Sequence, residues 1–132
     1  MRILVDTNIL LSAMWFKNSR VAKTLLFIAE KHELIVCDSS IVEMKDVIKR
    51  KTPEVLMDME LFLEEFSYEI IPPVEDDELL IRDPKDQPIL NAAIANNIDI
   101  IITGDKYFLS LNLECPKSMT IAQFLESEGV DL

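Results

Sequence analysis

The chain is 132 residues long, and 49% of its residues are hydrophobic while 28% are charged. A chain of this size can bury enough apolar surface to fold, so we expect one compact domain that spans residues 1–132. The apolar runs are shorter than the roughly 20 residues of a membrane span, and Asp6 interrupts the first run too early for a signal peptide, so we expect a cytoplasmic protein that does not enter a membrane.

The formal net charge is −11, whereas proteins that bind nucleic acid usually present a basic surface. The charge is unevenly distributed, however. Residues 54–78 contain ten Asp or Glu and no Lys or Arg, whereas residues 1–53 contain nine basic and six acidic residues. A basic cluster follows Glu43 and consists of Lys45, Lys49, Arg50 and Lys51. Charge runs of this kind more often form solvated surfaces, so that simpler interpretation stands beside a binding role.

Strand-like and helix-like segments alternate along the whole chain. In the first half, the predicted elements are a strand at residues 2–5, a helix or turn at 9–16, a helix at 20–31, a strand at 33–37 and a helix that opens at Ser39 or Ser40 and ends before Pro53. In the second half, they are a helix at 54–66, a strand at 68–71, a helix at 86–96, a strand that ends at Thr103, a short helix after Asp105, a short strand near 118–119 and a final helix to about Glu126. This alternation predicts an α/β fold.

Four acidic residues follow or open these elements. Asp6 and Asp105 each come just after a predicted apolar strand, whereas Glu43 and Asp86 lie near predicted helix starts. Open parallel sheets bind ligands at the carboxyl ends of their strands, so the two aspartates are expected at a binding edge. The two helices can bring their acids over the same edge.

A structural role is the alternative for each acid, because acidic side chains near helix starts cap the helix and complement its dipole. Ser40 and Glu43 match the S-x-x-E capping box. Asp83, Pro84 and Asp86 match an N-cap, a proline at the first helical position and an acid at the third. The helices after the two strands could be capped in the same way by Asp6 or Thr7 and by Asp105.

Capping alone does not predict that all four acids converge on one edge. Carboxylates packed into one cleft repel one another and hold protons unless a cation is present. Mg²⁺ and Mn²⁺ take oxygen ligands and suit such a cluster. The one histidine, His32, falls at a predicted helix end, and Cys37 and Cys115 lack metal-ligand spacing, so zinc is not expected.

The ordered motifs resemble those of the PIN-domain ribonucleases, and the resemblance covers nearly the whole chain. The motifs are Val5-Asp6-Thr7-Asn8-Ile9-Leu10, residues 39–43, Arg82-Asp83-Pro84-Lys85-Asp86 and Thr103-Gly104-Asp105. The chain is similar in particular to the single-domain bacterial and archaeal PIN proteins of toxin–antitoxin systems. Each motif is short, and the specificity lies in the ordered set.

This resemblance implies a three-layer α/β/α sandwich with a central parallel sheet. It implies that catalysis and metal binding fall on Asp6, Glu43, Asp86 and Asp105, and that Asn8 and Thr103 orient Asp6. It further implies Mg²⁺ or Mn²⁺ as the cofactor, single-stranded or structured RNA as the substrate, an antitoxin protein as a partner and a homodimer as the assembly.

The implied reaction is hydrolysis of a phosphodiester by a metal-activated water, which leaves a 5′-phosphate and a 3′-hydroxyl. RNA is then held through backbone contacts and base stacking. The candidate phosphate contacts are Lys45, Lys49, Arg50, Lys85 and Lys106, and the candidate stacking residues are Trp15 and Phe16.

Two functions from other classes compete with this one. A PIN-like binding module that cleaves little by itself would act through a protein partner, which could dock on the acidic segment 54–78. An aspartyl-phosphate phosphohydrolase would use Asp6 as its nucleophile, but that chemistry generally needs a second acid where Asn8 stands. It also leaves Glu43 and Asp86 without a role.

Overall fold

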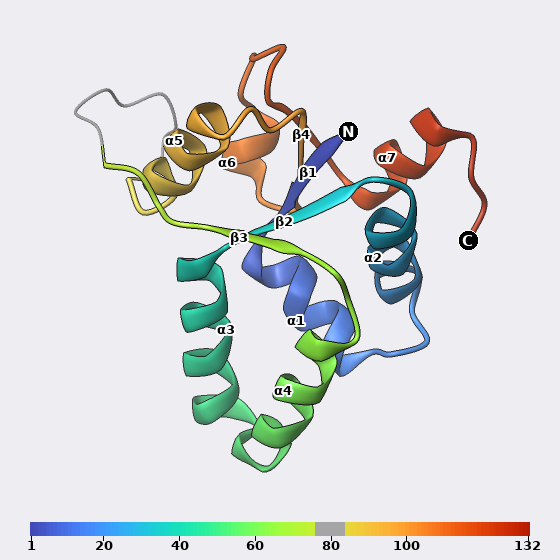
Figure 1. Cartoon of the computed structure of the whole chain (residues 1–132), viewed down its shortest axis with the longest axis vertical. Coiled ribbons are helices and arrows are strands. Elements are labelled where there is room, and N and C mark those ends of the chain that lie inside the picture. Colours follow the sequence, from blue (N-terminus) through green and yellow to red (C-terminus); the bar gives the residue numbers. More distant parts are fainter. Residues whose placement is uncertain (76–83) are drawn as a thin grey trace.

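The computed structural model describes residues 1–75 and 84–132. Within these ranges it contains a five-stranded sheet in which all paired strands are parallel (Figure 1). The strands are β1 (Arg2–Val5), β2 (Glu33–Cys37), β3 (Glu69–Ile71), β4 (Ile100–Ile102) and β5 (Lys117–Met119). The helices are α1 (Thr7–Trp15), α2 (Arg20–Lys31), α3 (Asp38–Lys51), the 3-10 helix η1 (Pro53–Val55), α4 (Leu56–Glu64), α5 (Gln87–Ala95), α6 (Lys106–Leu109) and α7 (Ile121–Glu128).

The strand order β3-β2-β1-β4-β5 places β1 at the centre of the sheet. Leu4 of β1 pairs with Ile35 of β2 on one side and with Ile101 of β4 on the other. The chain therefore adds β2 and β3 on one side of β1 and then crosses to the other side for β4 and β5. Where the strand order reverses, the connections leave the strand ends in opposite directions and open a crevice.

The two faces of the sheet are covered by different helices. Side chains alternate between the faces along a strand, so Ile3 and Val5 of β1 point one way and Leu4 points the other. The Ile3 and Val5 face packs against residues of α1, α2, α3, α4 and α7, whereas the Leu4 face packs against residues of α5 and α6. Figure 1 shows α5 and α6 on the opposite side of the sheet from α1, α3 and α4. The predicted α/β/α sandwich is confirmed.

Most predicted elements agree with the structure, and the strands at 2–5 and 33–37 and the helix at 20–31 agree residue for residue. The helix predicted at 54–66 is different. It is divided into η1 and α4, because Val55 departs from helical geometry with φ −103° and ψ 15°. Pro53 opens the shorter element, where its missing amide costs no hydrogen bond.

The unequal charges of the sequence fall on two neighbouring helices. α3 exposes Lys45, Lys49 and Arg50, and α4 exposes Asp58 and Glu60. α3 and α4 follow one another through η1 and lie next to each other in Figure 1. A basic and an acidic surface therefore adjoin.

Across the described ranges, the helices fall short of the length and apolar character needed to cross a membrane.

The sheet interior predicts the first stability test. Ile35 is fully buried in β2, so Ile35→Ala is expected to lower the free energy of unfolding by about 2–5 kcal/mol through lost burial and the cavity that remains. Ile70 on the edge strand β3 is 52% exposed, and Ile70→Ala is expected to cost less than about 1 kcal/mol. Urea denaturation of both variants measures the difference, and equal losses would contradict the burial assigned to β2.

Candidate active site

A pocket of about 290 Å³ opens at the carboxyl ends of β1 and β4, where the strand order reverses. The residues that line it are Asp6, Thr7, Asn8, Glu43, Lys85, Asp86, Ile89, Asp105 and Phe108. All four acids of the predicted set are among them. They come from four different parts of the fold: the ends of β1 and β4, the helix α3 and the turn before α5.

Asp6 lies at the end of β1 and at the N-cap of α1. Its Oδ1 accepts a hydrogen bond from the amide of Ile9 at 3.0 Å, which is the ordinary capping bond. Its Oδ2 accepts a short bond from the hydroxyl of Thr103. The capping role considered for Asp6 is therefore present, and the same carboxylate also lines the pocket.

Asp105 is arranged in a similar way after β4. Its Oδ1 accepts from the amide of Tyr107 at 2.8 Å, so it caps the short helix α6. Its own amide donates to the hydroxyl of Thr103 at 2.9 Å. Thr103 is completely buried, and its one hydroxyl joins the backbone of Asp105 to the carboxylate of Asp6.

The pKa of Asp6 lies above its ordinary value of 3.8. Burial is the main cause because it removes water from the ionised carboxylate, and the negative charge of Asp105 raises the pKa further. Hydrogen bonds from Thr103 and from the amides of Ile9 and Asn8 act in the opposite direction. The pocket thus disfavours the ionised form of Asp6, and a bound cation would favour it.

Glu43 reaches the pocket from α3. Its Oε2 accepts a hydrogen bond from the hydroxyl of Thr7 at 3.1 Å. The capping-box interpretation of Ser40 and Glu43 is wrong, because α3 begins at Asp38 and Ser40 lies inside its first turn, buried to 1% exposure. Because α3 starts directly after β2, Glu43 lies in its second turn, beyond the free amides at the helix start. The Glu43 carboxylate therefore faces the neighbouring helix α1.

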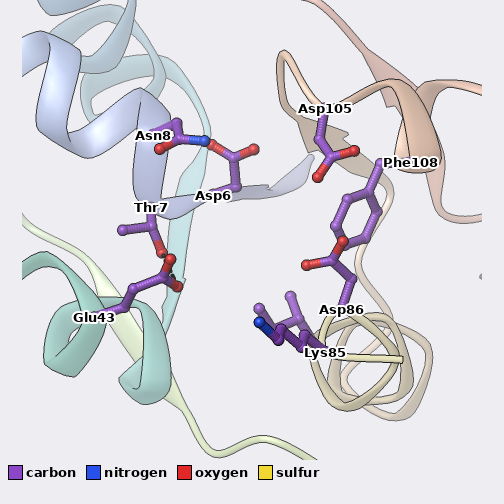
Figure 2. A pocket seen from close by; sticks show the side chains of 9 residues that line it. Asp6, Thr7, Asn8, Glu43, Lys85, Asp86, Asp105 and Phe108 are labelled. Atoms are coloured by element: carbon purple, nitrogen blue, oxygen red, sulfur yellow. Dashed lines mark hydrogen bonds between the residues drawn. The ribbon is translucent and has the colours of Figure 1, made fainter. Parts of the chain in front are cut away.

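Asp86 occupies the N-cap position of α5, but its side chain does not cap the helix. The prediction that Pro84 is the first helical residue is wrong, because residues 84–86 form a turn and the helix begins at Gln87 with Pro88 in its first turn. The cap predicted for Asp83 lies outside the described residues. Figure 2 shows the carboxylate of Asp86 directed into the pocket, on the opposite side from Glu43.

The donor set suits a hydrated hard cation. In residues 1–75 and 84–132, no three Asp, Glu, His or Cys side chains form a group that could hold a metal ion directly. Mg²⁺ needs fewer protein ligands than that, because it keeps several waters and binds through one or two carboxylates. Among the residues that the structure describes, the lining contains four carboxylates and neither histidine nor cysteine, and the pocket has room for several waters at about 30 Å³ each.

The residues expected to contact RNA are dispersed. Of the five basic candidates, Lys85 lines the pocket. Lys45, Lys49 and Arg50 are exposed along α3 beyond the lining, and Lys106 lies 5.4 Å from the ring centre of Tyr107. The two candidate stacking residues, Trp15 and Phe16, lie at the end of α1 far from Asp6, and the Trp15 indole donates to the hydroxyl of Thr52 at 3.3 Å.

Three lining residues were not identified from the sequence: Thr7, Ile89 and Phe108. The sequence indicates Thr7 only as a possible helix cap and as part of the motif around Asp6, although its position directly after Asp6 is a usable signal. Ile89 and Phe108 belong to apolar helix faces, where the sequence indicates burial but not the cavity it borders. Asn8, which was expected to orient Asp6, is exposed at the pocket, and its backbone amide lowers the pKa of Asp6.

The raised pKa of Asp6 predicts a stability effect. The folded state holds the proton more tightly than the unfolded state, so the free energy of unfolding falls as pH rises from 3.8 through the folded pKa. Asp6→Asn removes this loss and keeps an oxygen that can cap α1. We expect a higher unfolding free energy than wild type at neutral pH in a chelator, measured by urea denaturation.

The matched control is Asp131→Asn at the exposed end of the chain, which removes the same charge without burial. This control measures how much the unfolding free energy changes when any one negative charge is removed from a chain with a net charge of −11. If the unfolding free energy of both variants depends on pH as that of wild type does, the burial of Asp6 has no energetic consequence. The raised pKa of Asp6 would then be wrong.

The double role of Thr103 predicts a second effect. Thr103→Val leaves an amide and a carboxylate oxygen without their partner, so we expect a loss of about 1–3 kcal/mol in unfolding free energy. The pKa of Asp6, followed by NMR, should rise further because the Thr103 bond lowers it. Thr24→Val is the control, since Thr24 is equally buried but its hydroxyl bonds to the Arg20 carbonyl in its own helix. A loss no larger than that of the control would contradict the assigned role.

Comparison with known proteins agrees with this arrangement. A solved structure with a similar fold is a chain in the crystal structure of VapBC2 from Rickettsia felis bound to a DNA fragment from their promoter, with a TM-score of 0.70 and 19% sequence identity. The match covers 91% of this chain and 98% of that chain. No curated protein matches the sequence. A profile of the PIN domain matches residues 2–107, so the chain belongs to the PIN domain family.

Proposed function

We propose that the chain is a metal-dependent endoribonuclease that hydrolyses phosphodiester bonds of single-stranded RNA in the cytoplasm. One observation carries the proposal: acids from four separate elements line one pocket at the reversal of the strand order. Membership of the PIN domain family supports it, because PIN domains are generally nucleases. The overall fold shared with a chain of the VapBC2 crystal structure adds the proposal that this protein is the toxin of a toxin–antitoxin pair.

The proposed cofactor is Mg²⁺ or Mn²⁺, held by Asp6, Glu43, Asp86 and Asp105 directly or through water. Such an ion, when bound, lowers the pKa of its water and neutralises charge on the phosphoryl oxygens. The chain itself supplies fixed acceptors. Asp6 and Asp105 are held in place by the amides of the helices they cap and by Thr103, so their positions need little rearrangement.

The basic side chains proposed to hold the RNA are dispersed over the pocket lining, α3 and α6, and a flexible single strand can follow such a dispersed set. Lys85 in the pocket lining is the proposed contact to the phosphate beside the scissile bond. Lys45, Lys49 and Arg50 on α3, together with Lys106, would hold the rest of the strand. The acidic α4 would repel RNA and confine the strand to the basic side of the molecule.

A second candidate function is the binding module that acts through a partner. The observation in its favour is the outer face of α4, where Met57 is 70% and Leu61 is 57% exposed next to acidic side chains. Isolated exposed apolar residues are common, but a pair one turn apart on an acidic helix suits a basic amphipathic partner. An antitoxin with that chemistry is compatible with either function.

Cleavage of a mixed-sequence single-stranded RNA tests the proposal. The wild-type chain should cut the RNA internally when Mg²⁺ or Mn²⁺ is present and should stop when a chelator is added. The Asp6→Asn, Asp86→Asn double variant should lose more than about 100-fold in rate, which exceeds the usual effect of losing a group that only supports a metal ligand. Gel analysis with end-labelled RNA measures rate and cleavage positions together.

The matched control is the Asp58→Asn, Asp131→Asn double variant, which makes the same charge change at two exposed positions outside the pocket. It should cut like wild type. Absence of cleavage by a folded wild-type chain that binds Mn²⁺ would favour the binding module. An aspartyl phosphate trapped on Asp6 with a phosphomonoester would favour the phosphohydrolase instead.

A further inference from the structure

Glu43 differs from the other three acids of the pocket in how it is held. Asp6 and Asp105 follow strands and cap helices, and Asp86 stands at the start of α5. Glu43 is instead an exposed residue in the second turn of α3, with a longer and more flexible side chain. Such a side chain loses about 1.5–2 kcal/mol of rotamer freedom when it is fixed, so a pocket that needs it in one place must supply a partner.

The hydroxyl of Thr7 is that partner, and it lies 3.1 Å from Oε2 of Glu43. A threonine in a helix commonly bonds to the carbonyl four residues earlier, as Thr24 does with Arg20 at 2.7 Å. Thr7 is the first residue of α1, and Ile3, four residues earlier, belongs to β1. Its hydroxyl therefore has no helical carbonyl behind it and reaches 36 positions along the sequence to Glu43.

The position of Thr7 is itself fixed. Its side chain is 5% exposed, so its rotamer is restricted by packing. The residue before it, Asp6, donates its amide to the carbonyl of Ile102 at 3.3 Å, which continues the pairing of β1 with β4. Thr7 thus holds the carboxylate of Glu43 at a defined position relative to the end of the sheet, where Asp6 and Asp105 lie. Figure 2 shows Thr7 and Glu43 together on one side of the pocket, across from Asp86.

The hydrogen bond from the Thr7 hydroxyl occupies one of the two oxygens of the Glu43 carboxylate. Thr7 donates to Oε2, so the other oxygen of Glu43 retains its capacity to accept from a hydrated cation. The hydroxyl also restricts the rotation of the carboxylate. Groups that orient a metal ligand in this way typically contribute 10- to 100-fold to metal affinity without touching the ion.

We propose that Thr7 is a positioning residue that holds Glu43 toward the pocket, so that the affinity of the site for a divalent ion depends on its hydroxyl. This inference rests on the part of the proposed function in which the acidic pocket binds a divalent ion. It adds a residue that acts only through Glu43 and that lies outside the four acids.

Titration calorimetry with Mn²⁺ tests the inference without RNA. Thr7→Val keeps the shape of the side chain but removes the donor, and it should weaken Mn²⁺ binding by about 10- to 100-fold. Thr7→Ser restores a hydroxyl at the same position and should return the affinity to within a few-fold of wild type. The melting temperatures of both variants, measured in a chelator, establish that the folded state is retained.

A double-mutant cycle separates positioning from direct coordination. If Thr7 acts through Glu43, then Thr7→Val in a Glu43→Ala background should change the Mn²⁺ affinity by no more than about twofold. A further large loss in that background would show that Thr7 acts on the ion independently, and it would overturn the inference. Unchanged affinity for Thr7→Val in the wild-type background would overturn it as well.

The RNA cleavage assay keeps the two proposals distinguishable. A wild-type chain that binds Mn²⁺ but cuts no RNA contradicts the nuclease function, while the calorimetric cycle still decides the role of Thr7. A chain that binds no Mn²⁺ overturns both. If cleavage occurs, Thr7→Val should require a higher Mn²⁺ concentration for half-maximal rate, and Thr7→Ser should not.

Discussion

The pairing of β1 with β4 is the constraint on which the rest of the structure depends. The first three strands are added in one direction from β1, and the chain then returns to the free side of β1 to place β4. This reversal brings together the ends of two strands that are almost a hundred residues apart in the sequence. Asp6 and Asp105 are neighbours for that reason alone, and the crevice between them is the one that an open parallel sheet leaves at such a reversal.

The same pairing makes the ionised form of Asp6 less favourable, because it buries this carboxylate near that of Asp105. Asp6 is partly buried near a second carboxylate, and the pKa of Asp6 rises as a consequence. The compensating interactions come from groups the fold already provides: the amides of α1 and the hydroxyl of Thr103. Helix capping and site formation are therefore not competing explanations for Asp6 and Asp105. One side chain does both, because a carboxylate at a strand end is also at the start of the next helix.

Helix packing completes the pocket on both sides of this centre. α3 lies against α1 and brings Glu43 to Thr7, and the turn before α5 directs Asp86 from the other side. The apolar contacts that hold these helices contribute no chemistry, but they set how far apart the acids stand. The separate surfaces of α3 and α4 then place basic groups and acidic groups on different parts of the molecule. A strongly negative chain therefore still presents basic side chains, which the proposed RNA substrate would require.

The sequence by itself determined the local elements and the family. A continuous apolar run such as residues 34–37, or an apolar period of 3.6 as at residues 20–31, depends on neighbouring residues alone, so the strand at 33–37 and the helix at 20–31 could be predicted to the residue. The four acids could be named for the same reason, since each stands in a short local motif. The caps made by Asp6 and Asp105 could also be expected from the sequence, but only the tertiary structure decided which residue holds Glu43. The capping box at Ser40 and Glu43 is a local pattern that the packing of α1 against α3 overrides, and the partner of Glu43, Thr7, lies 36 positions away. Contacts of that kind arise from the order of the strands and from the packing of the helices, and short-range patterns carry no information about either.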